Sequence, residues 1–432
     1  MVLVYTHKVT PRLSYILKHF FIRLINVKVN ITTEVSEFIA HNGPKMSYTG
    51  KPLANELFVK CNELLFEQGI NDIEVNMSNW GEVPVFFQNN PKGEIPFDIF
   101  AASFYLLSRY EEYLPYVQDE FERFPASESL AFQQGFLEKP LVDIWALKFL
   151  SILKNSFQEF TFLEREFQMI STIDINNLFA YKQKGVPRNF GGIVADIFTL
   201  RFDKVIERVF VLLGLKKDPF DTFDEILRIS KDGNIETIFF FLIGDYTTYD
   251  TNVSSSNNVY RSIIKSIADY VSVGLKPSYF TMRNSDKLKK EKKRIEDIVN
   301  QPIVRSRQHY LRLRLPETYQ NLLDLEIMED HSMGYESQYG FRASTCTPFY
   351  FYDLDFEIQT PLKIVSFAFM DITFKEHLEL IPAIAKSKIS ELLKEVKNVN
   401  GTFVTLFHNE SLSENEHWKD WKGIYQYLYE DK

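Results

Sequence analysis

The first part of the chain alternates short apolar runs with stretches of helical periodicity. Residues 2–6 (VLVYT) are an apolar run that predicts a buried strand. Residues 11–24 begin with proline and repeat apolar side chains at helical spacing, which predicts a helix. A strongly apolar helix is predicted over residues 96–113, and a loop followed by another helix over 123–149. We therefore expect residues 1–160 to form a smaller α/β domain.

Near residue 160 the pattern changes to a regular alternation of strands and helices. Strands are predicted over residues 167–176, 235–246, 273–279, 303–313, 334–345, 364–374 and 402–410. Helices are predicted over residues 196–213, 259–272 and 287–297. This alternation predicts a largely parallel sheet, and roughly seven repeats favour a closed or nearly closed (β/α) barrel. The expected second domain covers residues 165–432.

Composition and charge exclude several classes of protein. A net charge of −9 argues against nucleic-acid binding, which requires a basic face. The basic run 287–294 continues into acidic residues of the same helical pattern, so we expect a solvated helix face there. Cys61 and Cys346 are too few for a disulfide framework and fit a reducing compartment.

The apolar runs and the N-terminal residues indicate a soluble protein. Residues 1–13 lack the apolar stretch of a signal peptide, and the longest apolar run, 238–243, is far too short to cross a bilayer. The chain holds 39 Phe and 22 Tyr, which suit sugar-stacking surfaces as well as thick cores, although core packing is expected for most of them. We predict a cytoplasmic location without a membrane span.

Polar residues lie at or near the ends of the predicted strands. They are Asp174, Asn176, Asp245, Lys276, His309, Arg342, Asp371 and His408. In (β/α) barrels the functional side chains gather at the carboxyl ends of the strands. Taken singly, each of these residues is more often a turn or capping residue, because every parallel strand must end in something polar.

Six segments carry a family resemblance. They are residues 172–185 (TIDINNLFAYKQKG), 239–257, 274–279 (GLKPSY), 306–319, 340–354 (GFRASTCTPFYFYDL) and 407–412 (FHNESL). Together they resemble the polysaccharide deacetylase (NodB-homology) family. Upstream, residues 6–16, 38–45, 96–115 and 123–131 resemble the additional N-terminal domain, of unknown function, of Bacteroidetes-type members. The resemblance implies an irregular (β/α) barrel that removes acetyl groups from glycans.

The resemblance also implies roles for individual residues. Asp174 matches the general base, Arg342 the residue that orients it, and His408 the general acid. His309 and Asn176 stand at metal-ligand positions, where Zn²⁺ or a similar divalent ion would activate water.

Two positions depart from the pattern that the resemblance implies, and both concern the metal. Asn176 offers a neutral carbonyl where the family has an acidic ligand. Lys276 stands where a histidine is expected, and an ammonium has no lone pair and repels a cation. The metal ligands are then reduced to His309, so the cofactor is either a divalent ion held weakly or none.

Several alternatives remain open for these residues. Asp174 with Asn176 also fits a strand-end turn, and His309 fits a strand histidine without a site role. Lys276 is either a surface lysine beside Pro277 or an ammonium that replaces the metal's charge, paired with Asp174 or with an anionic substrate group. For Arg342, an apolar surrounding favours a carboxylate partner, and Asp174 is the candidate.

Lys276, Asp245 and Tyr279 are the expected substrate contacts. The leading hypothesis is hydrolysis of an acetamide or acetate group on a glycan or glycan precursor. The alternative is a catalytically inactive barrel that binds a glycan, and a third hypothesis is an interaction scaffold built on the N-terminal domain. A carbohydrate is the expected partner in the first two hypotheses, and the oligomeric state is left open. A cytoplasmic location favours a biosynthetic precursor over a polymer of the cell surface.

Overall fold

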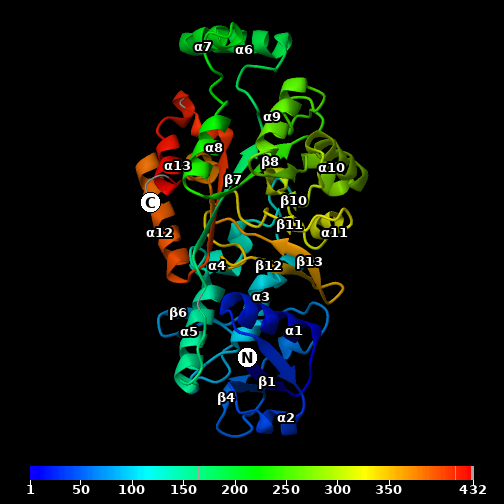
Figure 1. Ribbon diagram of the computed structural model, residues 1–432, viewed down its shortest axis with the longest axis vertical. Coiled ribbons are helices and arrows are strands. Elements are labelled where there is room, and N and C mark those ends of the chain that lie inside the picture. Colours follow the sequence, from blue (N-terminus) through cyan, green and yellow to red (C-terminus); the bar gives the residue numbers. More distant parts are fainter. Residues whose placement is uncertain (164, 414, 430–432) are drawn as a thin grey trace. The chain divides into compact units, whose positions relative to one another are not determined.

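Contacts between residues divide the chain into two units in the computed structural model, which describes residues 1–163, 165–413 and 415–429 (Figure 1). Unit 1 comprises residues 1–168, 313–369 and 389–404, and unit 2 comprises residues 169–312, 370–388 and 405–432. The chain first leaves unit 1 after residue 168, whereas the predicted domains end at residue 160 and begin at residue 165. Residues 313–369 and 389–404, which were predicted to belong to the second domain, group with the N-terminal residues.

Unit 1 contains a four-stranded parallel sheet in the order β2-β1-β3-β4. Its strands are β1 (Val2–Thr6), β2 (Val29–Thr32), β3 (Lys45–Thr49) and β4 (Leu57–Lys60). Helix α1 (Pro11–Lys18) begins at Pro11, where the Thr10 side chain accepts a hydrogen bond from the backbone N–H of Leu13. The predicted strand 2–6 and helix 11–24 are confirmed, since the helix continues as the π-helix η1 (His19–Leu24).

The apolar helix predicted over residues 96–113 is shorter in the structure. Helix α3 (Ile99–Leu107) is buried along its whole length, and the carboxylate of Asp98 caps its first turn. Arg109 has a φ of 54° and interrupts the helix, so η3 (Tyr110–Tyr113) follows as a separate 3-10 turn. The helix predicted within residues 123–149 is α5 (Leu141–Ser156).

The remaining elements of unit 1 include the two-stranded sheet of β5 and β6. They are α2 (Val35–Ala40), η2 (Glu63–Leu65), β5 (Ser78–Trp80), β6 (Val83–Val85), η4 (Ala126–Glu128), α4 (Leu130–Gln133), α11 (Glu317–Leu323), β11 (Glu329–Asp330), β12 (Phe349–Asp353) and β13 (Ile358–Ile364). Strands β12 and β13 pair in antiparallel fashion, and β11 pairs with β13 in parallel. The strand predicted over 334–345 was wrong. Positive φ angles at Gly340 (123°) and Ser344 (52°) break the extended backbone there.

Unit 2 is built around parallel strands in the order β7-β8-β9-β10. They are β7 (Gln168–Ile175), β8 (Glu236–Leu242), β9 (Ser272–Lys276) and β10 (Arg305–Ser306). The run Thr237 to Leu242 is buried without alternation, as expected for a strand covered on both faces. Strand β10 is shorter than predicted, and beyond its end Tyr310 and Leu311 adopt positive φ angles of 58° and 50°.

Beyond β7 the sheet continues with β15 (Thr402–His408) and β14 (Phe369–Met370), in the order β10-β9-β8-β7-β15-β14. The prediction of a mixed α/β chain with a largely parallel sheet is confirmed. Closure into a polysaccharide-deacetylase-type barrel and the two-domain arrangement stay predictions.

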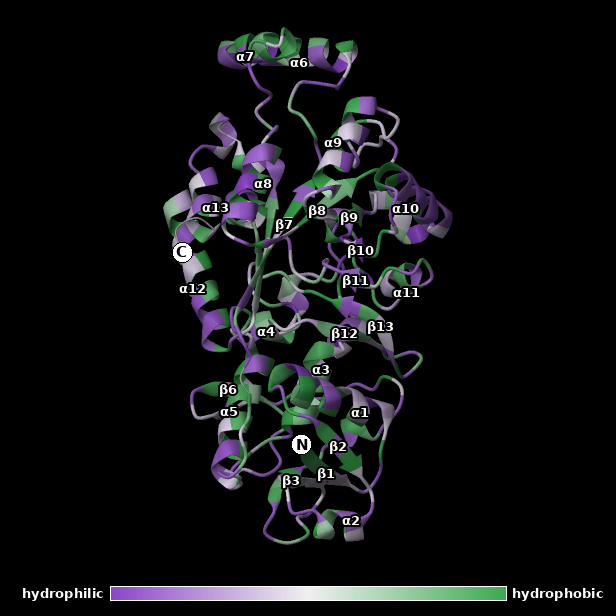
Figure 2. Cartoon of the chain, viewed as in Figure 1, coloured by the Kyte–Doolittle hydropathy of each residue, from purple (hydrophilic) through white to green (hydrophobic). Residues whose placement is uncertain are grey.

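Helices and turns complete unit 2. They are α8 (Phe223–Asp232), α9 (Asn258–Ala268), η5 (Tyr279–Arg283), α10 (Ser285–Val299), η6 (His309–Leu311), η7 (Thr373–His377), η8 (Asn409–Leu412), η9 (Glu416–Trp418) and α13 (Lys422–Tyr429), while α12 (Pro382–Asn398) contributes residues to both units. Most of the basic run in α10 is solvated, as predicted, and Figure 2 colours much of this helix hydrophilic.

The single helix predicted over 196–213 is instead the end of one helix and the whole of another. Helix α6 (Val186–Phe198) and helix α7 (Phe202–Leu212) pack against each other as a hairpin (Figure 1). The break lies at Leu200, whose φ is 58°. None of the described helices has both the length and the apolar composition needed to cross a membrane.

Candidate functional site

Five of the predicted site residues lie at carboxyl ends of strands in unit 2. Asp174 is near the end of β7 and Asn176 follows it, Lys276 ends β9, His309 follows β10, and His408 ends β15. A cavity of about 210 Å³ opens at these ends. Its lining consists of Asn176, Asn177, Leu242, Tyr249, Thr251, His309, Tyr310, Ile372, His408, Glu410 and Trp418. Strand geometry thus brings Asn176, His309 and His408 to one cavity.

Asp174 is buried between two cationic side chains. Nζ of Lys276 donates to its Oδ2 at 2.6 Å, and Nη1 of Arg307 donates to its Oδ1 at 3.0 Å. All three side chains are nearly inaccessible to solvent. Burial alone would raise the pKa of Asp174, but Lys276 and Arg307 outweigh it and hold this pKa below its usual range. Asp174 is therefore an ionised carboxylate with both oxygens engaged, which makes it a weak base.

Lys276 had two alternative interpretations, a surface lysine or an ammonium paired with Asp174. In the structure it is buried and paired with Asp174. Burial lowers its pKa and Arg307 acts in the same direction, whereas Asp174 opposes both. The positive charge of Lys276 thus depends on the carboxylate beside it. Because Arg307 also donates to Oγ1 of Thr172 at 2.8 Å, the cation pair is fixed to β7 at two points.

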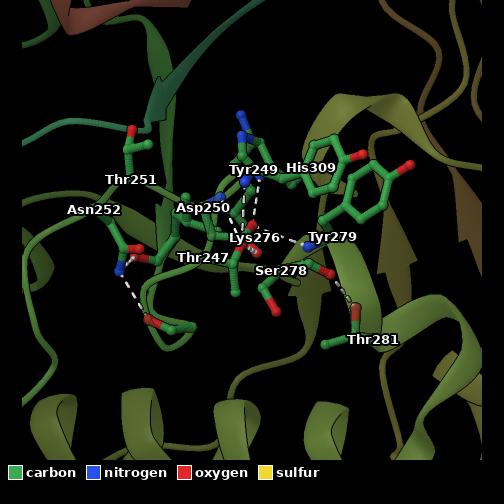
Figure 3. Close-up of polar contacts among 12 residues, drawn as sticks. Thr247, Tyr249, Asp250, Thr251, Asn252, Lys276, Ser278, Tyr279, Thr281 and His309 are labelled. Carbon is green, nitrogen blue, oxygen red and sulfur yellow. Dashed lines mark hydrogen bonds and ion pairs between the residues drawn. The ribbon is translucent and has the colours of Figure 1, made fainter. Parts of the chain in front are cut away.

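His309 is oriented by a carboxylate that the sequence analysis did not single out. Its Nδ1 lies 2.9 Å from Oδ1 of Asp250, which also accepts the backbone N–H of Tyr279 at 3.0 Å (Figure 3). Oδ2 of Asp250 accepts from the Thr247 hydroxyl at 2.8 Å. Burial, with Lys276 nearby, lowers the pKa of His309 to about 4 although Asp250 opposes this shift. At neutral pH the imidazole is uncharged, so Nδ1–H donates to Asp250 and Nε2 keeps its lone pair.

His408 has the same kind of support. Its Nδ1 lies 2.8 Å from Oδ1 of Asp371, and its backbone N–H donates to Oδ2 of the same carboxylate at 2.6 Å. Asp371 directly follows β14 and is fully buried. Two histidines thus line the cavity, each with one ring nitrogen held by a buried carboxylate.

Asn176 contributes an unused acceptor. Its Oδ1 is buried and has no hydrogen-bond partner among the described residues. A buried carbonyl oxygen without a partner is costly, so this atom is suited to a donor supplied by a ligand.

The donor set does not suit a divalent metal. Within the described residues, no group of three or more His, Cys, Asp or Glu side chains is arranged to hold a metal ion. The acidic-ligand position carries Asn176, and the second histidine position carries the ammonium of Lys276. A divalent cation placed there would face that buried positive charge. We therefore derive no chemical step through a metal.

Arg342 has a different partner from the one predicted. Its Nε and Nη2 bind the two oxygens of Glu112 in unit 1, at 2.9 and 2.6 Å. The predicted pair of Arg342 with Asp174 was wrong. Arg342 lies in the irregular stretch that replaces the strand predicted over residues 334–345, and its partner is the buried Glu112 of η3. The guanidinium on Asp174 belongs to Arg307. The available sequence signal for Arg307 was its position two residues before His309, within the strand predicted over residues 303–313.

Neither of the other two predicted substrate contacts, Asp245 and Tyr279, lines the cavity. Asp245 is exposed, pairs with Arg294 at 2.7 Å and does not line the cavity. Tyr279 stacks on Tyr249 with ring centroids 3.9 Å apart and an interplanar angle of 8°. The ring of Tyr310 meets both edge-on. Since Tyr249, Tyr310 and Trp418 line the cavity, Tyr279 lies behind an aromatic wall rather than in it.

A larger hollow of about 1170 Å³ lies at the opposite, amino-terminal ends of β8, β9 and β10. No histidine is among the residues that line it. Ligands of parallel sheets bind at the carboxyl ends of the strands, so the smaller cavity is the better candidate site.

A family of unknown function, DUF7033, matches residues 2–158. This match covers most of the N-terminal part of unit 1 and leaves the candidate site outside it. No curated protein matches the chain.

Solved structures of polysaccharide deacetylases are similar to part of the chain. A Mycobacterium smegmatis protein assigned to this class is 11% identical over 60% of this chain and 84% of its own, with a TM-score of 0.35. A polysaccharide deacetylase from Bacillus cereus is 11% identical over 61% and 90%, with a TM-score of 0.30. A CE4 family pseudoenzyme from Bacillus anthracis is 14% identical over 62% and 63%, with a TM-score of 0.28. TM-scores of this size do not establish a shared activity.

Proposed function

We propose that unit 2 is a polysaccharide-deacetylase-like module that binds a glycan or glycan precursor without metal-dependent hydrolysis. One observation carries the proposal: the ammonium of Lys276 lies 2.6 Å from Asp174. In a metal-dependent deacetylase the base needs an unengaged carboxylate beside a cation-binding position. Here both carboxylate oxygens of Asp174 accept hydrogen bonds, and the positive charge beside them is the Lys276 ammonium.

The cavity chemistry supports a neutral sugar ligand. The rings of Tyr249, Tyr310 and Trp418 offer apolar faces for the C–H groups of a sugar ring, and Oδ1 of Asn176 offers an acceptor for a hydroxyl or acetamide N–H. A volume of about 210 Å³ is below the roughly 300–1,000 Å³ of pockets that bury drug-sized ligands, so it suits one sugar unit.

The two His–Asp pairs favour a second candidate, metal-free hydrolysis of an acetate ester on the sugar. Water would attack the acetyl carbonyl carbon and pass its proton to Nε2 of His309. The bond from the acetyl carbon to the sugar oxygen would break as that oxygen takes a proton from His408. An ester is the expected substrate, because an alcohol leaves more readily than an amine.

Binding and acetate release separate the two candidates. We expect an N-acetylglucosamine tetramer to bind in calorimetry with an affinity that EDTA does not change. We expect no acetate release from this probe with added Zn²⁺, and release from an O-acetylated sugar only if the second candidate holds. Zn²⁺-dependent acetate release from the tetramer that is lost in His309→Ala would overturn the proposal.

The metal argument has its own test. Lys276→His combined with Asn176→Asp supplies, with His309, three donors at the positions that the resemblance assigns to a metal. We expect this double variant to bind Zn²⁺ in calorimetry. The matched control, Lys276→His with Asn177→Asp, changes the neighbouring amide and should bind more weakly. Equal Zn²⁺ binding by the original chain would contradict the argument.

A further inference from the structure

The hairpin of α6 and α7 exposes a concentration of large apolar side chains. Twelve of the thirty-two exposed large hydrophobic residues of the described chain fall within residues 186–215. They are Val186, Phe190, Ile197, Phe198, Leu200, Phe202, Ile206, Val209, Phe210, Leu212, Leu213 and Leu215. Phe198 is 84% exposed, and Val211 is the single fully buried apolar side chain that α6 and α7 contribute. Figure 2 shows both helices with extensive hydrophobic colouring. Such an exposed surface marks an interaction site.

Polar contacts, rather than an apolar core, hold the hairpin together. Arg208 on α7 pairs with Asp196 on α6 at 2.7 Å. Gly192 makes room for this arginine, since a Cβ there would lie 2.3 Å from its Nη1. At the base, the carboxylate of Asp218 accepts the backbone N–H groups of Ala180, Tyr181 and Lys182 at 2.8, 2.9 and 3.0 Å. The apolar side chains are therefore not needed inside the hairpin.

The charge of the hairpin differs in sign from that of the whole chain. Residues 180–218 contain eight Lys or Arg and four Asp or Glu, a net charge of +4, while the whole chain carries −9. Arg201 and Lys204 lie at the start of α7 beside exposed Phe198, Leu200 and Phe202. A positive amphipathic surface is complementary to anionic lipid headgroups.

We propose that the hairpin of α6 and α7 binds the surface of an anionic lipid bilayer. Helices of 13 and 11 residues are too short to span, because a membrane crossing needs about 20. They lie in the headgroup region with their apolar side chains inserted and their lysines and arginines near the phosphates. This proposal goes beyond glycan binding and does not depend on it.

A second copy of the chain is the less suitable occupant. A symmetric contact between two hairpins would bring one +4 segment against another, which costs electrostatic free energy. An anionic bilayer removes that cost and covers the same apolar side chains.

Vesicle flotation of the full chain tests the proposal. We expect binding to vesicles containing phosphatidylglycerol, weaker binding to pure phosphatidylcholine, and a decrease with added salt. The variant Phe190→Ser/Phe198→Ser/Phe202→Ser should lower the partition coefficient by about tenfold or more, since each side chain inserts into the bilayer. Arg201→Glu with Lys204→Glu should remove the preference for anionic vesicles.

A matched control distinguishes this surface from general hydrophobicity. Val117→Ser/Tyr270→Ser/Phe356→Ser removes three equally exposed apolar side chains elsewhere and should leave binding unchanged. Circular dichroism checks that each variant folds. The proposal fails if the original chain does not float with any of the vesicles tested. It also fails if both triple variants lose binding equally. It also fails if light scattering shows a dimer that the hairpin variant abolishes while vesicles still do not bind.

Discussion

Buried charges occur in both units but are used differently. In unit 1, Glu112 accepts from Arg109 at 2.7 Å and from Nε and Nη2 of Arg342, and Glu111 accepts from Arg109 at 2.7 Å. In unit 2, each His–Asp pair uses one ring nitrogen and leaves the other on a residue that lines a cavity. Burial of charge alone therefore does not mark a site. The carboxylates of the His–Asp pairs in unit 2 differ in that each orients a histidine that lines a cavity.

The largest expected effect comes from breaking the network of unit 1. Glu112→Gln leaves Arg109 and Arg342 buried with less negative charge, and we expect it to lower the free energy of unfolding by about 5 kcal/mol. Urea unfolding measures the loss. Glu120→Gln, at an exposed carboxylate, is the control and should change stability little. An unchanged unfolding midpoint in Glu112→Gln would show that this network is not structural.

Asp174→Asn should cost somewhat less, about 3–4 kcal/mol, because it leaves Lys276 and Arg307 buried without their carboxylate. The pKa of Lys276 should fall further, since burial and Arg307 remain while the opposing influence of Asp174 is lost. Urea unfolding measures the first effect, and NMR titration of isotopically methylated lysines measures the second. A Lys276 pKa that does not fall would contradict the ion pair.

The depressed pKa of His309 predicts a pH dependence of stability. Between pH 4 and the usual histidine value of about 6.5, the unfolded chain binds a proton at this residue and the folded chain does not. Stability should therefore rise with pH across this window, by up to about 3 kcal/mol from His309. Urea unfolding at several pH values should give a smaller slope for His309→Gln. Equal slopes would mean that His309 is not buried as a neutral ring.

The smallest effect is expected at the aromatic wall. Tyr249→Ala should weaken binding of the N-acetylglucosamine tetramer by about 1 kcal/mol, because one stacking face is lost while the hydrogen-bonding groups remain. Calorimetry measures the change. Tyr246→Ala, an exposed tyrosine outside the cavity lining, is the control, and an equal loss there would argue against stacking at Tyr249.

The strands that support the site could be predicted from the sequence because their apolar runs end abruptly in polar residues. This holds for β7 with Asp174 and for β15 with His408. Asp250 was missed because it lies in a loop well after β8, with no local pattern to connect it to His309. Arg342 was predicted from the resemblance and Arg307 was not considered, and the buried Glu112 could be found only in the tertiary structure.

The break between α6 and α7 was harder to predict, because it depends on the backbone conformation of one residue. Leu200 ends the first helix of the hairpin with a positive φ, although neither glycine nor proline stands in residues 196–213. The long helix predicted there was reasonable from periodicity and wrong about its bounds.

The carboxylate of Asp218 also makes the hairpin modular. Since it binds the backbone at residues 180–182, the chain enters and leaves the hairpin at almost the same place. An insertion closed in this way adds a surface without altering the path between β7 and β8. Residues 183–217 thus form an insertion whose two ends are tied together at Asp218, outside the strand that carries Asp174.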